Sequence, residues 1–484
     1  MRARAVMVLG TGSHVGKSLL TTALCRILRQ DGYRVAPFKA QNMSLNSAAT
    51  PDGGEIGRAQ ALQAEAAGIA PTVDMNPILL KPTSDRSSQV IVRGRIWQDA
   101  TAVDYHRRRT RELFAIVCES YERLAATYDA IVLEGAGSPA EINLRSGDIV
   151  NMRMAHAADA RCLLVGDIDR GGVFASLFGT IALLDDADRA RIAGTIVNKF
   201  RGDLALFEPA LPLLEEKTGR PCFGVVPYLP DVGLEEEDGL GLDAVRIAKR
   251  PPWIDADVPQ RRARIAVVAW PAIANYTDFD ALLREPSVEL AYVETADALH
   301  GADLVIIPGS KSTLASLRWL EASGIGAALR AGVAPFAFGV CGGMQAMGER
   351  IDDPHEVEGG GSASGLGMLA FSTTLVRQKV CERASGEIVA PRMLGCEPSD
   401  RRIDGYEIHV GATSYGPSTL PFARIVRESD GRSLDDGAIS ADGRAIGTYL
   451  HGIFDNDSFR ATLVTALRSA RGLAPTLRFG KFRA

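Results

Sequence analysis

Phe336–Met347 reads Phe-Ala-Phe-Gly-Val-Cys-Gly-Gly-Met-Gln-Ala-Met, and this stretch decides how the second half of the chain folds. An apolar run typical of a buried strand ends at Val340, and a helical pattern begins at Met344. Between them lies Cys341, with glycines at positions 339, 342 and 343. A sharp strand-to-helix turn that exposes one side chain needs small neighbours, so the pattern predicts a nucleophile elbow.

The predicted elbow gives Cys341 a chemical role. Its thiolate would face the amino end of the following helix, whose positive dipole stabilises an anion. The alternative is a buried cysteine at a tight glycine-rich turn, because free cysteines are usually buried. The motif resembles the nucleophile of class I glutamine amidotransferases, which take ammonia from the side-chain amide of glutamine. The resemblance implies that the other half of the chain uses that ammonia.

Length and composition limit the remaining possibilities. A chain of 484 residues is too long for a single core, so two or three domains are expected. A hydrophobic content of 46% is ordinary for a soluble globular protein, and a net charge of −5 gives no sign of nucleic-acid binding. The seven cysteines include no Cys-x-x-Cys pair, which favours a reducing compartment. The apolar runs 5–9 and 173–184 are too short for a signal peptide or a membrane span. The sequence therefore predicts a cytoplasmic protein without a membrane partner.

The beginning of the chain predicts a phosphate-binding loop. Residues 5–9 look like a buried strand, residues 19–30 like a helix, and residues 10–18 read Gly-Thr-Gly-Ser-His-Val-Gly-Lys-Ser. In such loops backbone N–H groups hold the β-phosphate, the lysine bridges phosphates and the serine hydroxyl meets Mg²⁺. This variant, with one extra residue before Gly16, resembles dethiobiotin synthetase and its relatives; a plain glycine turn is the alternative. The expected ATP-binding residues are Thr11, Gly12, Ser13, Val15, Gly16, Lys17 and Ser18.

Lys39 and Asn198 are two further candidates for nucleotide binding. Lys39 follows a strand, and ligands of an open α/β sheet lie at the carboxyl ends of its strands, so Lys39 is expected to point toward the phosphates. A solvated surface lysine is the alternative. The dethiobiotin synthetase relatives also carry a lysine here, and they place an asparagine where Asn198 stands. The resemblance implies that Asn198 contacts the nucleotide base.

Glu134 and Asp167 are the candidate metal ligands, together with Ser18. Glu134 begins the sequence Glu-Gly-Ala-Gly after a buried strand, opposite the phosphate loop, where a Mg²⁺ ligand belongs. The same relatives have this sequence in the same place. Asp167 ends the next strand, in the position of a nucleotide-hydrolase aspartate that reaches Mg²⁺ or its water.

Two polar segments are candidate substrate contacts. Residues 41–47 read Gln-Asn-Met-Ser-Leu-Asn-Ser, and residues 84–89 read Ser-Asp-Arg-Ser-Ser-Gln before a strand at 90–92. Their amides, hydroxyls and guanidinium suit a polar, anionic ligand, and an ordinary turn cluster is the alternative for the second segment. The candidate substrate residues are Gln41, Asn42, Lys81, Arg86 and Gln89.

Strands alternate with helices up to about residue 227, which predicts an α/β fold with a doubly wound parallel sheet. The composition then changes, with acidic residues at 235–238 and Lys-Arg-Pro-Pro at 249–252. We expect an ATP-dependent synthetase domain at 1–245, a linker at 246–262, an amidotransferase domain at 263–471 and a tail at 472–484.

The second α/β unit supplies the surroundings of the elbow. A strand at 302–307 runs into Pro-Gly-Ser at 308–310 and then into a helix. Backbone N–H groups there could stabilise the oxyanion that forms when a thiolate attacks an amide. The glycines expected at the oxyanion site and the elbow are Gly309, Gly342 and Gly343.

A cysteine nucleophile needs a base nearby in space, and two histidines lie late in the second unit. His451 follows a strand and precedes the last helix, the position of the base in class I amidotransferases; His409 is the second candidate. Those enzymes usually have His-x-Glu, with the glutamate orienting the imidazole, but Ile453 stands at that place here. The sequence therefore predicts a Cys341–His451 dyad, with Asp455 or another carboxylate left open as a third member.

Few families join a dethiobiotin-synthetase-like domain to an amidotransferase that lacks His-x-Glu. Segments 38–47, 75–89, 166–172 and 405–411 together resemble the adenosylcobyric acid synthase family of cobalamin biosynthesis. The resemblance implies ATP- and glutamine-dependent amidation of the b, d, e and g carboxylates of adenosylcobyrinic acid a,c-diamide through acyl phosphates. ATP and Mg²⁺ would be the cofactors, and a corrinoid polycarboxylate, glutamine and ATP the partners. A homo-oligomer is left open.

Three other functions remain at this point. An a,c-diamide synthase, which amidates an earlier corrinoid, is disfavoured by the motifs at 41–47 and 84–89. A non-corrinoid amidotransferase is the second. The third is a P-loop partitioning ATPase with an inactive amidotransferase-like regulatory domain, which an intact Cys341 and His451 argue against.

Overall fold

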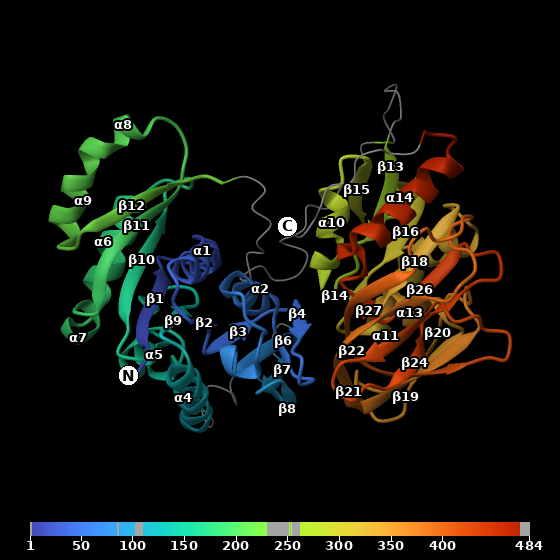
Figure 1. Cartoon of the computed structure of the whole chain (residues 1–484), viewed down its shortest axis with the longest axis horizontal. Helices are drawn as coiled ribbons and strands as arrows, with labels where there is room; N and C mark the ends of the chain where they lie inside the picture. The colour runs from blue at the N-terminus through green and yellow to red at the C-terminus, as the bar shows by residue number, and fades with distance from the viewer. Residues whose placement is uncertain are drawn as a thin grey trace. The chain divides into compact units, whose positions relative to one another are not determined.

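The chain divides into two compact units. Unit 1 contains residues 1–50 and 54–239, and unit 2 contains residues 51–53 and 240–484 (Figure 1). The computed structural model describes residues 2–84, 87–101, 110–229, 251, 253 and 262–474. The expected domain limits near 245 and 262 fall almost entirely outside these residues and stay predictions. Within the described part of the chain, each helix is too short or too polar to span a bilayer.

Six parallel strands form the central sheet of unit 1, in the order β12-β11-β10-β1-β9-β2 (Figure 1). They are β1 (Arg4–Gly10), β2 (Val35–Phe38), β9 (Ala130–Glu134), β10 (Arg161–Asp167), β11 (Ile192–Phe200) and β12 (Cys222–Pro227). The glycine loop follows β1, which lies between β10 and β9, so the ends of both neighbouring strands flank the loop. The predicted doubly wound parallel sheet is confirmed.

Both faces of this sheet are covered. Met7 and Leu9 of β1 pack into a core with Leu113 of α4, whereas Val8 packs on the other face with Leu20 of α1. Strands buried on both faces need continuous apolar runs, which is why β1 has no polar alternation. The helices are α1 (Lys17–Gln30), α2 (Arg58–Ala67), α4 (Thr110–Thr127), α5 (Met152–Ala157), α6 (Val173–Leu183), α7 (Asp186–Arg189), α8 (Leu204–Phe207) and α9 (Leu211–Thr218).

Smaller sheets lie between β2 and β9 in the chain. A four-stranded sheet has the order β3-β6-β7-β8, and β4 pairs with β5. The strands are β3 (Gln41–Met43), β4 (Ser47–Ala49), β5 (Glu55–Gly57), β6 (Ile78–Ser84), β7 (Ser87–Val92) and β8 (Arg95–Thr101). Of the polar segment 84–89, a candidate substrate contact or turn cluster, the described residues lie in the strands of the β6–β7 hairpin, where Lys81 pairs with Gln89. Its serines resemble a turn cluster, but cross-strand pairing overrides that local preference.

Unit 2 is built around a second sheet, in the order β15-β13-β16-β18-β26-β25. Its strands are β13 (Ala263–Val268), β15 (Val288–Val293), β16 (Leu304–Ile307), β18 (Phe336–Val340), β25 (Ala438–Ile439) and β26 (Ala445–Thr448). All neighbours are parallel except β25 and β26. The central position of β18 puts the predicted elbow at the middle of the sheet's carboxyl edge.

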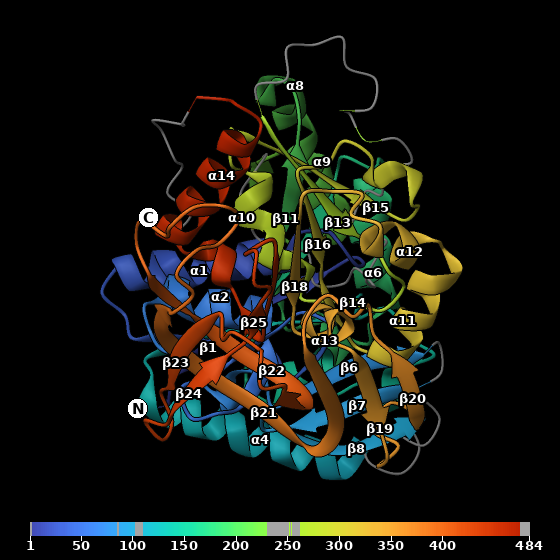
Figure 2. The ribbon, with the colours of Figure 1, turned by 90° about the vertical axis from the view of Figure 1, so that its right-hand side faces the viewer.

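A largely antiparallel sheet and several helices complete unit 2 around one apolar core. Its longest strands, β21 and β22, pair from Phe371–Tyr415 to Glu387–Arg402 (Figure 2). The strands outside the central sheet are β14 (Ile273–Ala274), β17 (Gly309–Ser310), β19 (Arg350–Asp353), β20 (Gly361–Ser364), β21 (Phe371–Ile388), β22 (Arg402–Tyr415), β23 (Ala423–Arg427), β24 (Ser433–Asp436) and β27 (Leu450–His451). The helices are α10 (Asp280–Leu283), α11 (Thr313–Ala322), α12 (Ile325–Arg330), α13 (Gly342–Met347) and α14 (Asp457–Ala470), with 3₁₀ turns η6 (Tyr276–Phe279) and η8 (Ile453–Asp455).

Candidate functional site

Cys341 occupies the sharp turn between β18 and α13 that the sequence predicted. Its φ of 53° and ψ of −111° lie outside the ordinary regions for an L-residue, a conformation that costs about 1–3 kcal/mol. The glycines around it allow the close approach of neighbouring backbone. A Cβ on Gly343 would lie 1.9 Å from the Ile307 carbonyl oxygen, and one on Gly342 would lie 2.8 Å from the Ser310 nitrogen. The turn is therefore tightly packed against β16 and β17.

The thiol of Cys341 is buried among backbone groups and one imidazole. Its Sγ lies 3.4 Å from the Ile408 carbonyl oxygen, and its N–H donates to the Thr448 carbonyl at 2.8 Å. The thiol also lies within hydrogen-bonding reach of the His451 side chain. A Cβ on Gly309 would lie 3.3 Å from Cε1 of His451, so Gly309 of β17 borders the imidazole.

His451 has a carboxylate partner that the sequence did not reveal. Its Nδ1 lies 2.6 Å from Oδ2 of Asp278, whose Oδ1 accepts a hydrogen bond from the Gly452 N–H at 3.1 Å. Both side chains are buried, with 2% and 4% of their surface exposed. Asp278 thus takes the place of the third member that the sequence left open, and the three side chains have the arrangement of a Cys341–His451–Asp278 triad. Asp278 lies in η6, far from His451 in the chain, so no local spacing could identify it.

The electrostatics of this triad favour the imidazolium. Burial by itself lowers the pKa of His451, but the Asp278 carboxylate and Cys341 together raise it to about 10. Proton transfer from the thiol to such an imidazole would leave a thiolate beside an imidazolium that Asp278 neutralises. Neither Ile453 nor Asp455 takes the place of the orienting glutamate. Ile453 is 1% exposed and packs in the apolar core, and Nδ1 of His451 is already bound to Asp278.

The second histidine candidate lies in a different polar cluster. His409 places Nδ1 2.9 Å from the Gly411 carbonyl oxygen and Nε2 3.4 Å from Oε1 of Glu407. Its ring stacks on Tyr449 at a centroid distance of 3.8 Å. Glu407 also pairs with Arg427 at 2.7 Å. These contacts fix His409 beside the triad and leave His451 as the imidazole that Cys341 faces.

In unit 1, Glu134 is the centre of a buried polar cluster. Its Oε1 accepts from the Ser18 hydroxyl at 2.8 Å and from Nζ of Lys39 at 3.0 Å, and its Oε2 accepts from Nε2 of Gln63 at 2.6 Å. Lys39 is 1% exposed, which excludes the surface-lysine alternative. Nζ of Lys17 donates to the carbonyl oxygens of Gly12 at 2.9 Å and Gly137 at 3.3 Å. Gln63 of α2 is a member that no sequence motif identified.

The donor set at Glu134 fits a Mg²⁺ ion. The Ser18 and Glu134 oxygens are 2.8 Å apart, close to the edge of an octahedron with metal–oxygen distances of about 2.0–2.1 Å. Magnesium commonly takes one or two protein ligands and completes its sphere with phosphate oxygens and water. Among the described residues, no group of three or more His, Cys, Asp or Glu side chains could hold a metal.

The structure groups Asp167 with cations and not with Glu134. Its Oδ1 accepts from the Asp169 N–H at 2.8 Å, and its carboxylate pairs with Lys199 at 3.4 Å and Arg170 at 3.9 Å. No hydrogen bond among the described residues joins Asp167 to Ser18 or Glu134. Its expected metal role therefore has less geometric support than that of Glu134.

Asn198 lies directly on the phosphate loop. Its Nδ2 donates to the Val15 carbonyl at 2.8 Å, and a Cβ on Gly16 would lie 2.1 Å from that nitrogen. Gly16 has a φ of 97°, so both its conformation and its neighbour require glycine. Oδ1 of Asn198 is buried and has no hydrogen-bond partner among the described residues. Thr11 and Ser13 lie on the same loop, and the Thr11 N–H donates to the Val165 carbonyl at 2.9 Å.

The candidate substrate residues are less exposed than the sequence implied. Nζ of Lys81 lies 2.7 Å from Oε1 of Glu55 and 2.8 Å from the Ser47 hydroxyl, in a pair that is almost fully buried. Nδ2 of Asn42 donates to Oε1 of Gln60 at 3.4 Å. A buried, paired lysine neutralises its carboxylate partner, so Lys81 has a structural task in this state. Gln41 is partly exposed, Gln89 is buried, and Arg86 lies outside the described residues.

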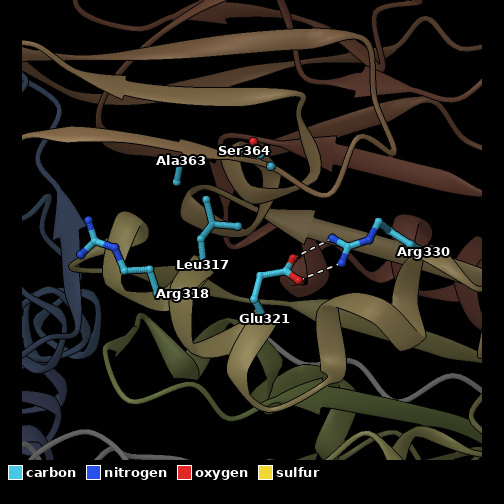
Figure 3. A pocket seen from close by; sticks show the side chains of 7 residues that line it. Leu317, Arg318, Glu321, Arg330, Ala363 and Ser364 are labelled. Atoms are coloured by element: carbon cyan, nitrogen blue, oxygen red, sulfur yellow. Dashed lines mark hydrogen bonds and ion pairs between the residues drawn. The ribbon is translucent and has the colours of Figure 1, made fainter.

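Two surface pockets of unit 2 lie apart from the triad. One of about 350 Å³ is bordered by α11, α12 and β20, where Arg330 makes a two-pronged ion pair with Glu321 at 2.6 and 2.8 Å (Figure 3). The other, of about 510 Å³, includes Phe336 at the amino end of β18, whereas Cys341 follows its carboxyl end. Neither lining contains a predicted site residue.

Comparison with known proteins matches both units. The CobQ/CobB/MinD/ParA nucleotide binding domain matches residues 6–242, and the CobB/CobQ-like glutamine amidotransferase domain matches residues 264–459. A cobyric acid synthase of Yersinia enterocolitica is 49% identical over 97% of this chain and 90% of its own length. Cobyric acid synthases of Pelotomaculum thermopropionicum and Klebsiella pneumoniae are 48% and 50% identical, over 98% and 97% of this chain and 89% and 91% of their own lengths.

Proposed function

Because the chain belongs to the cobyric acid synthase family, we propose that it uses ATP and glutamine to amidate the b, d, e and g carboxylates of adenosylcobyrinic acid a,c-diamide. Its family makes it an amidating ligase of cobalamin biosynthesis with a nucleotide-binding unit and a glutamine amidotransferase unit. The observation that carries the finer proposal is the triad of Cys341, His451 and Asp278, in a chain that also has a phosphate loop. An intact triad disfavours an inactive regulatory domain.

Ammonia release begins at Cys341. Its thiolate attacks the side-chain amide carbon of glutamine, and the protonated His451 gives its proton to the departing ammonia, which leaves a glutamyl thioester. Water then attacks the thioester with His451 as the base, so that glutamate leaves and the thiol is restored. Asp278 holds the proton on Nδ1 and thereby presents Nε2 to the reaction. The backbone around Gly309, Gly342 and Gly343 supplies N–H groups near the developing oxyanion.

Unit 1 makes the carboxylate reactive. A carboxylate resists ammonia because oxide is a poor leaving group. Transfer of the γ-phosphoryl group of ATP to the carboxylate, with release of ADP, gives an acyl phosphate, and ammonia then attacks its carbonyl carbon and displaces phosphate. Lys17 and Lys39 would offset the negative charge of the phosphates, and the buried Oδ1 of Asn198 offers an acceptor for the amino group of the base. Mg²⁺, held by Ser18 and Glu134, would neutralise charge on the transferring group.

The experiment is mass spectrometry of the corrinoid product. The purified chain is incubated with adenosylcobyrinic acid a,c-diamide, ATP, Mg²⁺ and glutamine, with the a,c-diacid precursor as a second substrate. Each amidation replaces a hydroxyl by an amino group, so the product mass counts the amides formed. Stepwise conversion of the a,c-diamide supports the proposal. Conversion of the precursor alone would make the chain an a,c-diamide synthase, and no conversion of either corrinoid would contradict the proposed substrate.

A further inference from the structure

Asp436 is a buried carboxylate that contacts the residues just before His451 in the chain. It ends β24 and is 1% exposed. Its Oδ2 accepts from the Thr448 hydroxyl, and its Oδ1 accepts from the Tyr449 N–H at 3.1 Å. Thr448 is the last residue of β26, and Tyr449 links it to β27, whose last residue is His451. One side chain thus holds the segment that carries the base.

The same segment also contacts the nucleophile. The carbonyl oxygen of Thr448 accepts from the N–H of Cys341 at 2.8 Å. The Tyr449 hydroxyl accepts from Nε2 of Gln345 at 3.2 Å, and Gln345 lies one helical turn after Cys341 on α13. The positions of Cys341 and His451 therefore depend on one segment, which Asp436 anchors from outside the triad.

We propose that Asp436 is a positioning residue for glutamine hydrolysis, which acts by fixing residues 448–451 so that His451 and Cys341 keep their mutual geometry. The inference rests on the proposed ammonia release at Cys341. It assigns no chemical step to Asp436, because Asp436 touches neither reacting side chain among its described contacts.

The direction of the hydrogen bonds specifies the charge state that this task needs. The Leu450 N–H donates to the Thr448 hydroxyl oxygen at 3.0 Å, so the Thr448 proton is directed to Asp436. The Tyr449 N–H can only donate. Asp436 must therefore accept at both oxygens, which the ionised form does best.

Burial opposes that ionised form. Removal from water, with Glu407 nearby, raises the pKa of Asp436 to about 7, although Thr448, the Tyr449 N–H and Arg427 favour the carboxylate. The other groups that face Asp436 have pKa values shifted away from neutrality. Burial favours a higher pKa for Glu407, but its bonds to His409 and Arg427 outweigh burial and lower the pKa overall. Burial raises the pKa values of Tyr415 and Tyr449. Acidification through neutrality should therefore release the segment and slow glutamine hydrolysis.

Protonation of Asp436 should favour the stability of the fold, although it should slow glutamine hydrolysis. The folded chain holds the Asp436 proton more tightly than the unfolded chain, whose aspartates titrate near pH 4. The resulting stabilisation is complete below about pH 4 and is lost as the pH rises through about 7. Above neutrality the wild type must bury the charged Asp436 carboxylate, and a variant with an uncharged side chain at this position avoids that free-energy cost. Asp436→Asn should thus be no less stable than the wild type at about pH 8 while it is a poorer glutaminase, a combination that a purely structural role does not give.

The test compares glutamate release and ammonium-supported synthesis in wild type and Asp436→Asn across this pH range. The matched control is Asp435→Asn, since Asp435 is exposed and pairs with Arg424 on the surface. Asp303→Asn is a second control, because burial also raises the pKa of Asp303, which directly precedes the amino end of β16. We expect Asp436→Asn to lower kcat for glutamine about tenfold to a hundredfold, with ammonium-supported synthesis unchanged. The acid limb near pH 7 should disappear in Asp436→Asn and persist in both controls.

A wild-type kcat and pH profile in Asp436→Asn would overturn the inference, as would an equal loss of glutamine- and ammonium-supported synthesis. If Asp436→Asn does not fold, Thr448→Val and Thr448→Ser decide the matter. Valine removes the donor and should reproduce the selective loss, whereas serine should restore activity, and equal activity of the two would also overturn the inference. A wild type that releases no glutamate would instead refute the proposed ammonia release itself.

Discussion

Glu134 in unit 1 and Asp278 in unit 2 are both buried carboxylates at the proposed sites, but their hydrogen-bond donors come from different kinds of surroundings. Glu134 takes donors from Ser18 of α1, Lys39 directly after β2 and Gln63 of α2. Asp278 takes donors from two adjacent residues, His451 and Gly452. A cation could take the place of a single donor at Glu134, because the three donors come from separate parts of the chain. The donors of Asp278 are two consecutive residues, which suits the orientation of a single imidazole.

The comparison predicts the largest effect for the loss of the phosphate site. Lys17→Ala or Glu134→Ala should abolish synthesis from both glutamine and ammonium, because either nitrogen source needs the activated carboxylate. Product formation with each nitrogen source measures this directly. The control is Lys217→Ala, since Lys217 is an exposed lysine of α9. Normal ammonium-supported turnover in either variant would contradict the proposed role of that residue in ATP use.

Loss of the nucleophile should affect only one nitrogen source. Cys341→Ala should abolish glutamine-supported synthesis and glutamate release, and it should leave ammonium-supported synthesis intact, because the thiol serves ammonia release alone. Cys396→Ser, at a half-buried free thiol of unit 2, is the matched control. If Cys341→Ala also loses the ammonium-supported reaction, the two units do not divide the chemistry in this way.

Loss of the orienting carboxylate should have an intermediate effect. Asp278→Asn should lower kcat for glutamine on the order of a hundredfold, because an amide cannot stabilise the imidazolium and can favour the wrong tautomer. Ammonium-supported synthesis should be unchanged. Asp455→Asn is the control, since Asp455 lies in η8 after His451, whereas Nδ1 of His451 is bound to Asp278. Equal activity of the two variants would show that Asp278 is not a third member and that Cys341 and His451 act as a dyad.

The smallest expected effect is on stability. Burial lowers the pKa of His451, but Asp278 and Cys341 raise it to about 10, so the folded chain binds this proton more tightly than the unfolded chain. The stabilisation is complete below the ordinary histidine pKa of about 6.5 and is lost as the pH rises through about 10. The melting temperature of Asp278→Asn should thus lie a few degrees below that of the wild type near pH 6, and the gap should narrow toward pH 10. A gap that stays constant over this range would contradict the assigned protonation.

The two carboxylates also differ in how far they could be predicted from sequence. Glu134 ends an apolar strand next to a recognisable phosphate loop, and the topology of a parallel sheet then brings it to Ser18. Asp278 reaches His451 across 173 positions, through a 3₁₀ turn with no motif of its own. The available signal was the polar run Asn-Tyr-Thr-Asp at residues 275–278, which follows the first strand of unit 2.

The same distinction applies to the fold. The parallel sheets were predictable because buried parallel strands are continuous apolar runs joined by helices. The β6–β7 hairpin was not, because Ser87, Ser88 and Gln89 are residue types that favour turns, and their strand conformation depends on pairing with β6 on one side and β8 on the other. Lys81 was predicted as a substrate contact, and its buried ion pair with Glu55 could be found only from the structure.

The most direct test of the whole account follows the nitrogen atom. The chain is supplied with glutamine that carries a heavy isotope in its amide nitrogen, together with ATP, Mg²⁺, the a,c-diamide corrinoid and an excess of unlabelled ammonium, and the isotope content of the product is measured by mass spectrometry. We predict labelled amides from the wild type and only unlabelled amides from Cys341→Ala. A wild-type product without label, or a labelled product from Cys341→Ala, would contradict ammonia release at the Cys341–His451–Asp278 triad.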